Sequence, residues 1–268
     1  MGKKVILITG ASSGIGKAAV EYLFEKGHTV YGASRTAADR NLSFTALKMD
    51  VNNDDSVNEA IRRIINEEGK IDVVINCAGF GLAGSIEDTS VDEAKALFET
   101  NFFGVFRVCK AVIPKMRNQK SGLIINIGSL AGLVPIPFQA FYSSSKYAIE
   151  SMTEALRMEL LPFGIRVVLI EPGDFKTGFT ANRKTAAQSN INGTYRRKFS
   201  KAVSIMEKDE SSGPSPVKIA GLIGRIIDNP SPRLRYTTGK LSQILPVKLR
   251  SYIPHKLSEY LLMKYYGL

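Results

Sequence analysis

Near the beginning of the chain, residues 5–16 read VILITGASSGIG. The apolar run predicts a buried strand, and the glycines after it allow a tight turn that brings the backbone close to a ligand. A helix expected over residues 15–26 would point its unpaired N–H groups and its positive end at a pyrophosphate. The spacing is Gly-x3-Gly-x-Gly, and its place directly after a strand favours dinucleotide binding. The predicted phosphate-binding residues are Gly10, Ser12, Ser13, Gly14, Ile15 and Gly16.

Outward from this turn, short apolar runs alternate with helical patterns. Strands are predicted at residues 29–34, 44–50, 72–76, 123–128, 167–171 and 233–238, and helices at 54–68, 90–118, 142–161 and 217–227. Several runs are apolar without alternation, which is typical of strands covered on both faces. The pattern predicts an α/β fold with a doubly wound parallel sheet and helices on both faces.

The whole chain, residues 1–268, is expected to form one dinucleotide-binding catalytic domain. Residues 176–213 are polar and weakly periodic, and we interpret them as an insertion or lid on the substrate side. Residues 240–268 are expected to form a tail that Pro246 and Pro254 break into short helices.

Composition excludes several classes of protein. The 268 residues are 44% hydrophobic and 23% charged, which argues against disordered, collagenous and membrane-spanning proteins. Cys77 and Cys109 are too few for a disulfide framework, so a reducing, cytoplasmic location is expected. We interpret both as small core residues. His28 and His255 are isolated, and no metal site is predicted.

The net charge of +11 belongs to the last third of the chain. Residues 176–268 carry 17 Lys/Arg and 5 Asp/Glu, whereas residues 1–175 carry 19 and 20. This third could provide a weak peripheral contact with a membrane, or a soluble basic surface. No nucleic-acid recognition motif accompanies the charge, so no nucleic-acid partner is expected. The tail has two further interpretations, closing the substrate pocket and packing on a partner subunit, and its prolines favour packing over membrane attachment.

The end of the second predicted strand indicates which dinucleotide binds. Ser34, Arg35 and Thr36 stand there, with no carboxylate before Asp39. A carboxylate would bind the ribose 2′-hydroxyl and repel a 2′-phosphate, whereas a guanidinium binds that phosphate with forked hydrogen bonds. The sequence therefore predicts NADP(H) over NAD(H), held by these three residues.

A proton-transfer pair opens the helix at 142–161. Tyr142 and Lys146 are four residues apart and share one helix face. A phenol has a pKa near 10, and a nearby ammonium favours the phenolate, so we expect this pair to exchange a proton with an alcohol or ketone oxygen. Taken alone, such a pair is common on solvated helix faces.

Together these features resemble the short-chain dehydrogenase/reductase family from Lys4 to about Thr177. Tyr142 lies 13 residues after Ser129, as in the family. The ordered set of motifs at these spacings is very specific. Besides the glycine turn, the matching segments are Asp50-Val51, Asn76-Cys77-Ala78-Gly79 (with Cys where the family has a second Asn), Asn101 to Gly104, Ile127 to Gly132, and Pro172-Gly173-Asp174-Phe175-Lys176-Thr177.

The resemblance implies a Rossmann-type sheet of about seven strands in the order 3-2-1-4-5-6-7, and a homo-oligomer, a dimer or tetramer. It makes Tyr142 the general acid in reduction and the base in oxidation. Lys146 would lower the pKa of the phenol and bind the nicotinamide ribose, Ser129 would donate to the substrate oxygen, and Asn101 would hold a water. The implied cofactor residues also include Asp50, Val51, Asn76, Ala78, Gly79, Pro172, Gly173, Phe175 and Thr177.

The substrate is expected to be a hydrophobic alcohol or ketone. Phe80, Val134, Phe138 and Phe179, with Ser129 and Tyr142, are its predicted contacts, because apolar side chains near the catalytic residues suit a bulky apolar molecule. The predicted function is an NADP(H)-dependent oxidoreductase for a hydroxysteroid or bile acid. The alternatives are a reductase of a lipid or retinoid carbonyl, such as acyl-dihydroxyacetone phosphate or retinal, and a non-catalytic NADP(H) sensor. The Ser34-Arg35 strand end and the long tail resemble the branch with 17β-hydroxysteroid dehydrogenases and acyl-dihydroxyacetone-phosphate reductases.

Overall fold

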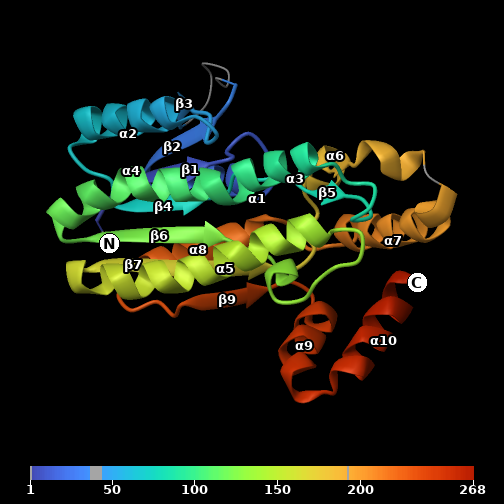
Figure 1. Cartoon of the computed structure of the whole chain (residues 1–268). Helices are drawn as coiled ribbons and strands as arrows, with labels where there is room; N and C mark the ends of the chain where they lie inside the picture. Colours follow the sequence, from blue (N-terminus) through green and yellow to red (C-terminus); the bar gives the residue numbers. More distant parts are fainter. Residues whose placement is uncertain (1, 37–43, 192) are drawn as a thin grey trace.

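A computed structural model describes residues 2–36, 44–191 and 193–268. Its main sheet has seven parallel strands in the order β3-β2-β1-β4-β6-β7-β9, which confirms the predicted order (Figure 1). The apolar runs form these strands because helices cover both sides of the sheet. The strands are β1 Val5–Thr9, β2 Thr29–Ser34, β3 Thr45–Lys48, β4 Val73–Asn76, β6 Gly122–Ile127, β7 Ile165–Pro172 and β9 Arg235–Thr238.

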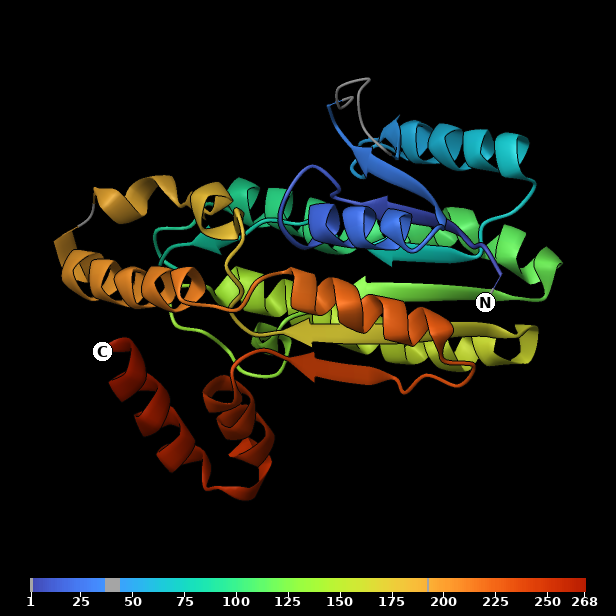
Figure 2. The ribbon, with the colours of Figure 1, turned by 180° about the vertical axis from the view of Figure 1, so that it is seen from behind.

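Two hydrophobic layers hold the helices on the sheet. On one face, α2 (Asp54–Glu68), α4 (Gly104–Gln119) and α5 (Ala140–Leu160) bury side chains such as Val57, Val108 and Ile149. On the other face, α1 (Gly14–Glu25) and α8 (Val217–Asp228) pack side by side through Leu23 and Ile223, as the reverse view shows (Figure 2). Both layers are fully enclosed, so the sheet is a rigid platform for the loops at its ends.

The helix expected over 90–118 is interrupted. Here α3 (Val91–Phe98) passes into the π-helical turn η1 (Glu99–Phe103), and α4 follows. Inserted π turns re-aim side chains and are frequent at functional sites. This one turns Asn101 inward, where its side chain is 1% exposed.

The chain adds further elements at the carboxyl ends of the strands (Figure 1). In the expected insertion, β8 (Lys184–Thr185) pairs with β5 (Leu82–Ala83), a small sheet that the sequence pattern does not reveal. This pairing ties the insertion to the rim of the main sheet. The other elements there are η2 Leu130–Gly132, α6 Phe179–Asn182, η4 Ala187–Asn190 and α7 Gly193–Ser211. The short turn η3 Leu161–Phe163 lies at the opposite end of the sheet, between α5 and the start of β7.

The tail forms α9 (Leu241–Leu249), η5 (Arg250–Tyr252) and α10 (His255–Tyr266), which turn back toward α7 (Figures 1 and 2). The prediction that Pro246 breaks the tail was wrong, because Pro246 lies inside α9. Its missing N–H would face the carbonyl of exposed Ser242, which water can satisfy. The break falls at Pro254, which directly precedes α10.

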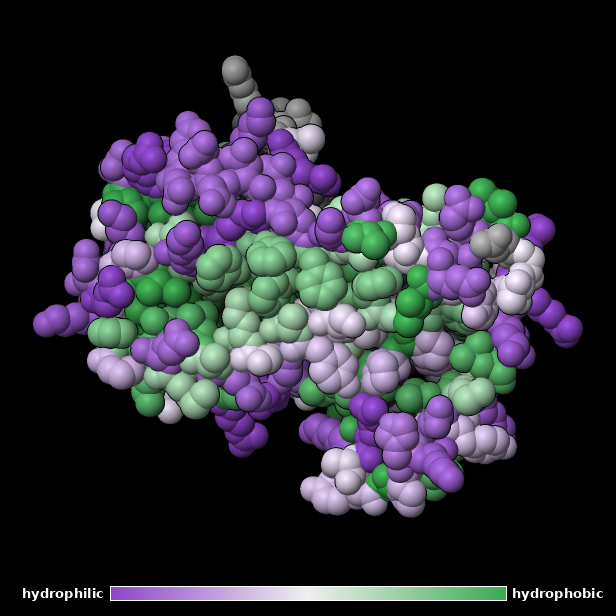
Figure 3. Space-filling model, in the orientation of Figure 1, coloured by the Kyte–Doolittle hydropathy of each residue, from purple (hydrophilic) through white to green (hydrophobic). Residues whose placement is uncertain are grey.

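An apolar band crosses the face formed by α4 and α5 (Figure 3). Phe103, Phe106 and Tyr147 are among its large side chains, each between 39% and 45% exposed. Across the described residues, no helix is both long and apolar enough to cross a membrane.

Candidate active site

A cleft of about 660 Å³ opens at the carboxyl ends of the strands, where the strand order reverses between β1 and β4. This is where α/β sheets bind ligands, because loops on either side diverge. The structure brings most of the predicted cofactor residues onto its wall. They are Gly10, Ser12, Ser13, Gly14, Ile15, Gly16, Ser34, Arg35, Asp50, Val51, Ala78, Gly79, Tyr142, Lys146, Pro172, Gly173, Phe175 and Thr177.

The glycine turn has the geometry of a phosphate cradle. Gly10 has φ +69°, and a Cβ on it would lie 2.9 Å from the backbone of Ala78. A Cβ on Gly16 would lie 2.3 Å from the carbonyl oxygen of Gly10. Ser13, the N-cap of α1, makes no side-chain capping bond, and the first helical turn carries no acid. The backbone N–H groups in the first turn of α1 and the Ser13 hydroxyl fit a dinucleotide pyrophosphate.

Thr9 joins this turn to the neighbouring strand. Its Oγ1 accepts from the backbone N–H groups of Cys77 and Ala78, at 3.0 and 3.1 Å. The link holds the Ala78-Gly79 backbone against the cleft. Burial raises the pKa of the Cys77 thiol to about 12, so it remains protonated.

Asn76 does not lie on the cleft wall, contrary to the prediction. Its side chain turns into the sheet and donates to Asn126 Oδ1 at 2.8 Å. Asn126 in turn donates to Thr153 of α5 at 2.9 Å. Asn76 therefore ties β4 to β6 beneath the cleft, because a buried amide takes the partners that the next strand offers.

At the other end of the cleft, Ser34 ends β2 and Arg35 follows it, and Asp50 and Val51 come after the neighbouring strand β3. Thr36 does not line the cleft; its carbonyl accepts from the Ser34 hydroxyl at 2.6 Å. This bond fixes the turn that presents Arg35. Asp39 lies outside the described residues.

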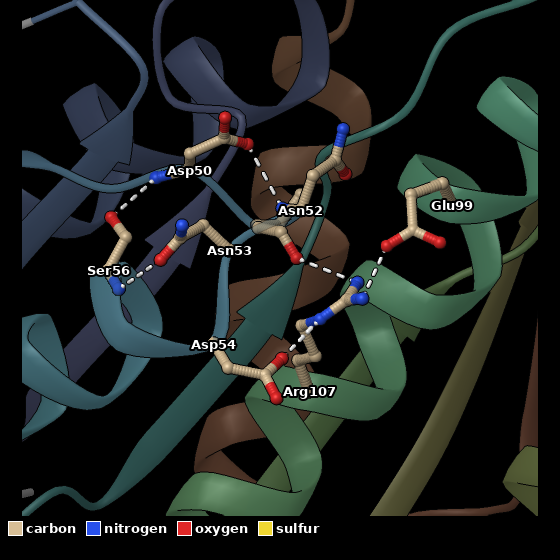
Figure 4. A network of polar contacts seen from close by, with 8 residues as sticks. Asp50, Asn52, Asn53, Asp54, Ser56, Glu99 and Arg107 are labelled. Carbon is tan, nitrogen blue, oxygen red and sulfur yellow. Dashed lines mark hydrogen bonds and ion pairs between the residues drawn. The ribbon is translucent and has the colours of Figure 1, made fainter.

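An arginine positions the loop at this end of the cleft (Figure 4). Arg107 of α4 donates to Asp54 at 2.5 Å and pairs with Glu99 of the π turn. Its third contact is the Val51 carbonyl, at 3.4 Å. In the same loop, Asp50 Oδ1 accepts from the backbone N–H of Asn52 at 3.0 Å. One side chain thus joins α2, the π turn and the loop after β3.

Tyr142 and Lys146 occupy the first turns of α5 and face the cleft. Lys146 Nζ donates to the Ile127 carbonyl at 2.9 Å and lies 5.8 Å from the centre of the Tyr142 ring. Ser129 lines the cleft as well and makes a side-chain hydrogen bond with Tyr142. The predicted acid, its lysine and its serine therefore meet in one place.

The pKa of the phenol lies higher than the sequence suggests. Burial raises the pKa of Tyr142 to about 12, Glu210 and Asp174 add to the rise, and the bond with Ser129 opposes it. Burial lowers the pKa of Lys146 to about 8. At neutral pH Tyr142 is protonated, the state that donates a proton to a ketone oxygen.

Asn101 stands behind Tyr142 and not on the cleft wall. Its amide donates to the Phe80 carbonyl at 3.0 Å and to Ser145 Oγ at 3.3 Å, and its Oδ1 accepts from the Phe80 N–H at 3.0 Å. These contacts tie the π turn to the Phe80 loop and to α5. Asn101 holds the walls that carry Phe80 and Tyr142 together.

The structure places the predicted apolar substrate residues in three different surroundings. Phe80 and Phe179 line the cleft, and the Phe179 ring lies 5.5 Å from that of Tyr142. Phe138 lines a second cavity instead, beside α10. Val134 lines neither cavity, because it is buried in the loop after η2.

Two carboxylates near Tyr142 were not predicted. Asp174 lines the cleft, and burial and nearby Glu210 raise its pKa to about 6. Glu210, at the end of α7, pairs with Arg183, whose side chain is 3% exposed. The Nε and Nη1 atoms of Arg183 find no hydrogen-bond partner among the described residues. Asp174 stands inside the Pro-Gly-x-x-x-Thr segment, but Glu210 carries no local signal because only the fold brings α7 to the cleft.

The tail contributes to this region. Gln243 of α9 donates to Asp174 Oδ2, and its Oε1 accepts from the Asp174 N–H at 3.1 Å. Arg250 donates to the Leu133 carbonyl at 2.8 Å. These contacts place the tail beside the cleft, as the interpretation that it closes a pocket requires.

Comparisons with known proteins agree with this site. Residues 4–188 match the family described as short chain dehydrogenase. A 3-ketodihydrosphingosine reductase of Bacteroides thetaiotaomicron is 43% identical over 268 residues, covering 100% of both chains. The structure of a short-chain dehydrogenase from Streptomyces avermitilis superposes with a TM-score of 0.83 at 29% identity and covers 97% of each chain. The structure of a Burkholderia phymatum short chain dehydrogenase/reductase in complex with NAD superposes with a TM-score of 0.79 at 25% identity and covers 93% of each chain.

The chain therefore belongs to the short-chain dehydrogenase/reductase family. It is an NAD(P)(H)-dependent oxidoreductase that acts on carbonyl or CH–OH groups.

Proposed function

We propose that this enzyme uses NADPH to reduce the ketone of a long-chain 2-amino ketone to a secondary alcohol. 3-Ketodihydrosphingosine is the representative substrate. It carries a ketone, an adjacent amine that is protonated in water, and a long alkyl tail. The similarity over the full length to a reductase of that name supports the choice.

The buried carboxylate of Asp174 favours an amino ketone over other hydrophobic substrates. It lines the same cleft as Tyr142, close enough to raise the pKa of the phenol. Its backbone and carboxylate bond to neutral Gln243, while Glu210 is paired with Arg183. An ammonium beside the ketone would compensate this buried carboxylate. A neutral hydroxysteroid or retinal offers no such charge, and an anionic bile acid would be repelled.

The chain's own residues then have defined tasks. Tyr142 donates the proton to the ketone oxygen, and Ser129 holds that oxygen through its hydroxyl. Lys146, fixed by the Ile127 carbonyl, supplies positive charge beside the phenol as the proton leaves. The bound nicotinamide cofactor supplies the hydride.

NADP(H) is proposed over NAD(H) because of Arg35. It lines the cleft at the end of β2, and Ser34 beside it is uncharged. A guanidinium in this place recognises a 2′-phosphate by paired hydrogen bonds. Equal KM values for NADPH and NADH would contradict this choice.

A panel of ketones tests the substrate class. NADPH oxidation is followed with 3-ketodihydrosphingosine, the same ketone without its amine, a ketosteroid, an oxidised bile acid and retinal. We expect the highest kcat/KM for the amino ketone. A preference for the ketosteroid or the oxidised bile acid would favour the hydroxysteroid or bile-acid function predicted from the sequence. If no ketone is reduced, a non-catalytic NADP(H) sensor would be favoured.

A second candidate is a phosphate-bearing lipid ketone such as acyl-dihydroxyacetone phosphate. The observation that favours it is Arg183, which is buried near the cleft with two N–H-bearing nitrogens lacking partners among the described residues. Including this ketone in the panel separates the two, because it reverses the charge next to the carbonyl.

We also propose that the chain forms a homo-oligomer through the apolar band over α4 and α5 (Figure 3). Size-exclusion chromatography with light scattering tests this, and a monomer at micromolar concentration would contradict it.

A further inference from the structure

A second cavity, of about 710 Å³, lies between α10 and the loop that leads into α5. We infer that this C-terminal groove, lined by Ile86, Pro137, Phe138, Ala140, Leu262 and Met263 among others, binds the alkyl chain of the substrate. This inference rests on the proposed function, which requires a place for a long apolar tail. No residue of the groove belongs to the catalytic set.

The groove adjoins the catalytic cleft. Ile136 lines both cavities. In the adjoining first turn of α5, Gln139 and Tyr142 line the cleft, whereas Ala140 lines the groove. A chain attached to a ketone at Tyr142 therefore has to pass only one turn of helix to enter the groove.

The wall between the two cavities is firmly held. The Gly84 N–H donates to the Phe138 carbonyl at 2.8 Å. Phe138 has φ +60°, which is unusual for a bulky residue and marks a constrained backbone. Its ring packs edge-on against Tyr195 and Phe199, at 6.2 and 5.6 Å between centroids. The groove is thus preformed, and an alkyl chain entering it needs little reorganisation of the protein.

The tail closes the groove from the other side. Arg250 anchors it by donating to the Leu133 carbonyl and to the Tyr147 hydroxyl, at 2.8 and 3.2 Å. Leu262 and Met263 of α10 then face the loop that contains Phe138 across the cavity. Mostly aliphatic and aromatic walls suit a hydrocarbon, and the bend past Ile136 suits a flexible chain better than rigid fused rings.

Chain length and one substitution test the inference. Amino ketones of increasing length, from about 8 to about 18 carbons, should gain roughly fourfold in kcat/KM per methylene until the groove is filled. Leu262→Trp should narrow the groove and lower kcat/KM for the longest ketone by at least about tenfold, the effect of two methylenes left in water. The shortest ketone should change less than about twofold, which also shows that the variant folds.

Leu261→Trp is the matched control. Leu261 is the preceding residue of α10, is 48% exposed and does not line the groove. It should leave the chain-length profile unchanged. A flat profile in the wild type, or equal losses for short and long ketones in Leu262→Trp, would overturn the inference while leaving the proposed function intact.

A binding measurement separates the groove from turnover. The chain contains no tryptophan, so Tyr195→Trp places a single reporter in the groove and Leu261→Trp places one outside it. A long-chain amine brominated near its tail should quench the first reporter and not the second. Quenching of neither, or of both equally, would refute binding in the groove. If no ketone is reduced, the proposed function fails, and this measurement still decides whether the groove binds hydrocarbon.

Discussion

Replacing Asp174 with Asn removes a buried negative charge and keeps the shape of the side chain. In the wild type, burial and Glu210 raise the pKa of Asp174 to about 6, compared with an ordinary value of 3.8. This difference corresponds to roughly 3 kcal/mol against the ionised form. An ammonium that relieves the whole penalty would gain the same free energy, about a hundredfold in affinity. A direct Coulomb estimate, about 4 kcal/mol for charges 4 Å apart at an effective dielectric constant of 20, has the same size.

We therefore expect Asp174→Asn to lower kcat/KM for the amino ketone by about a hundredfold. The same ketone without its amine should lose less than about threefold, because Asn still accepts the bond from Gln243. The assay is NADPH absorbance with both ketones at concentrations well below KM. The ratio of the two kcat/KM values isolates the contribution of the amine.

Asp228→Asn provides the charge-matched control. Asp228 is exposed at the end of α8 and does not line the cleft. The Asp228→Asn substitution should leave kcat/KM for both ketones unchanged. Equal losses for the two ketones in Asp174→Asn would mean that the carboxylate is structural, and unchanged activity with the amino ketone would refute ammonium recognition.

Three other outcomes are expected. Tyr142→Phe should lower kcat by about 10²- to 10⁴-fold while fluorescence titration shows unchanged NADPH binding; near-normal turnover would remove Tyr142 from proton transfer. Arg35→Ala should raise KM for NADPH by about tenfold or more and change KM for NADH less than about twofold, in steady-state kinetics with both cofactors. An equal change for the two would show that Arg35 does not contact the 2′-phosphate. Finally, kcat/KM for the amino ketone should rise with pH through about 6, because Asp174 is ionised above its pKa and ammonium binding is lost as pH falls through it. The ketone without an amine should show no such limb, and identical profiles would contradict the assignment.

Local patterns were sufficient for the sheet and for most of the residues that line the cleft around the glycine turn. Val5–Thr9 and Thr29–Ser34 form strands with the predicted bounds, and their middle residues are buried because helices cover both faces of the sheet. The glycine turn could also be predicted from the sequence, since the backbone approaches Gly10 and Gly16 so closely that no side chain fits there. Tyr142 and Lys146 meet in the cleft because helical spacing places them on one face.

Other features depend on contacts that no local pattern records. The π turn at Glu99–Phe103 is stabilised by Arg107 of α4 and by the bonds of Asn101 to the Phe80 loop, which comes before α3. Asn76 has the motif of a cofactor residue, yet its amide faces β6. Asp50 is followed by a loop whose position depends on α4.

The residue pattern of this chain was therefore enough for its class, its sheet and the meeting of Tyr142 and Lys146 in the cleft, because each arises from periodicity or short spacing. The part of the molecule proposed to bind substrate depends on the tertiary structure. Asp174, Glu210 and the groove beneath α10 come from segments separated by dozens of residues, and their proximity depends on how the insertion and the tail pack over the strand ends. Burial then alters their chemistry, as the raised pKa of Asp174 shows, and burial is a property of the assembled molecule.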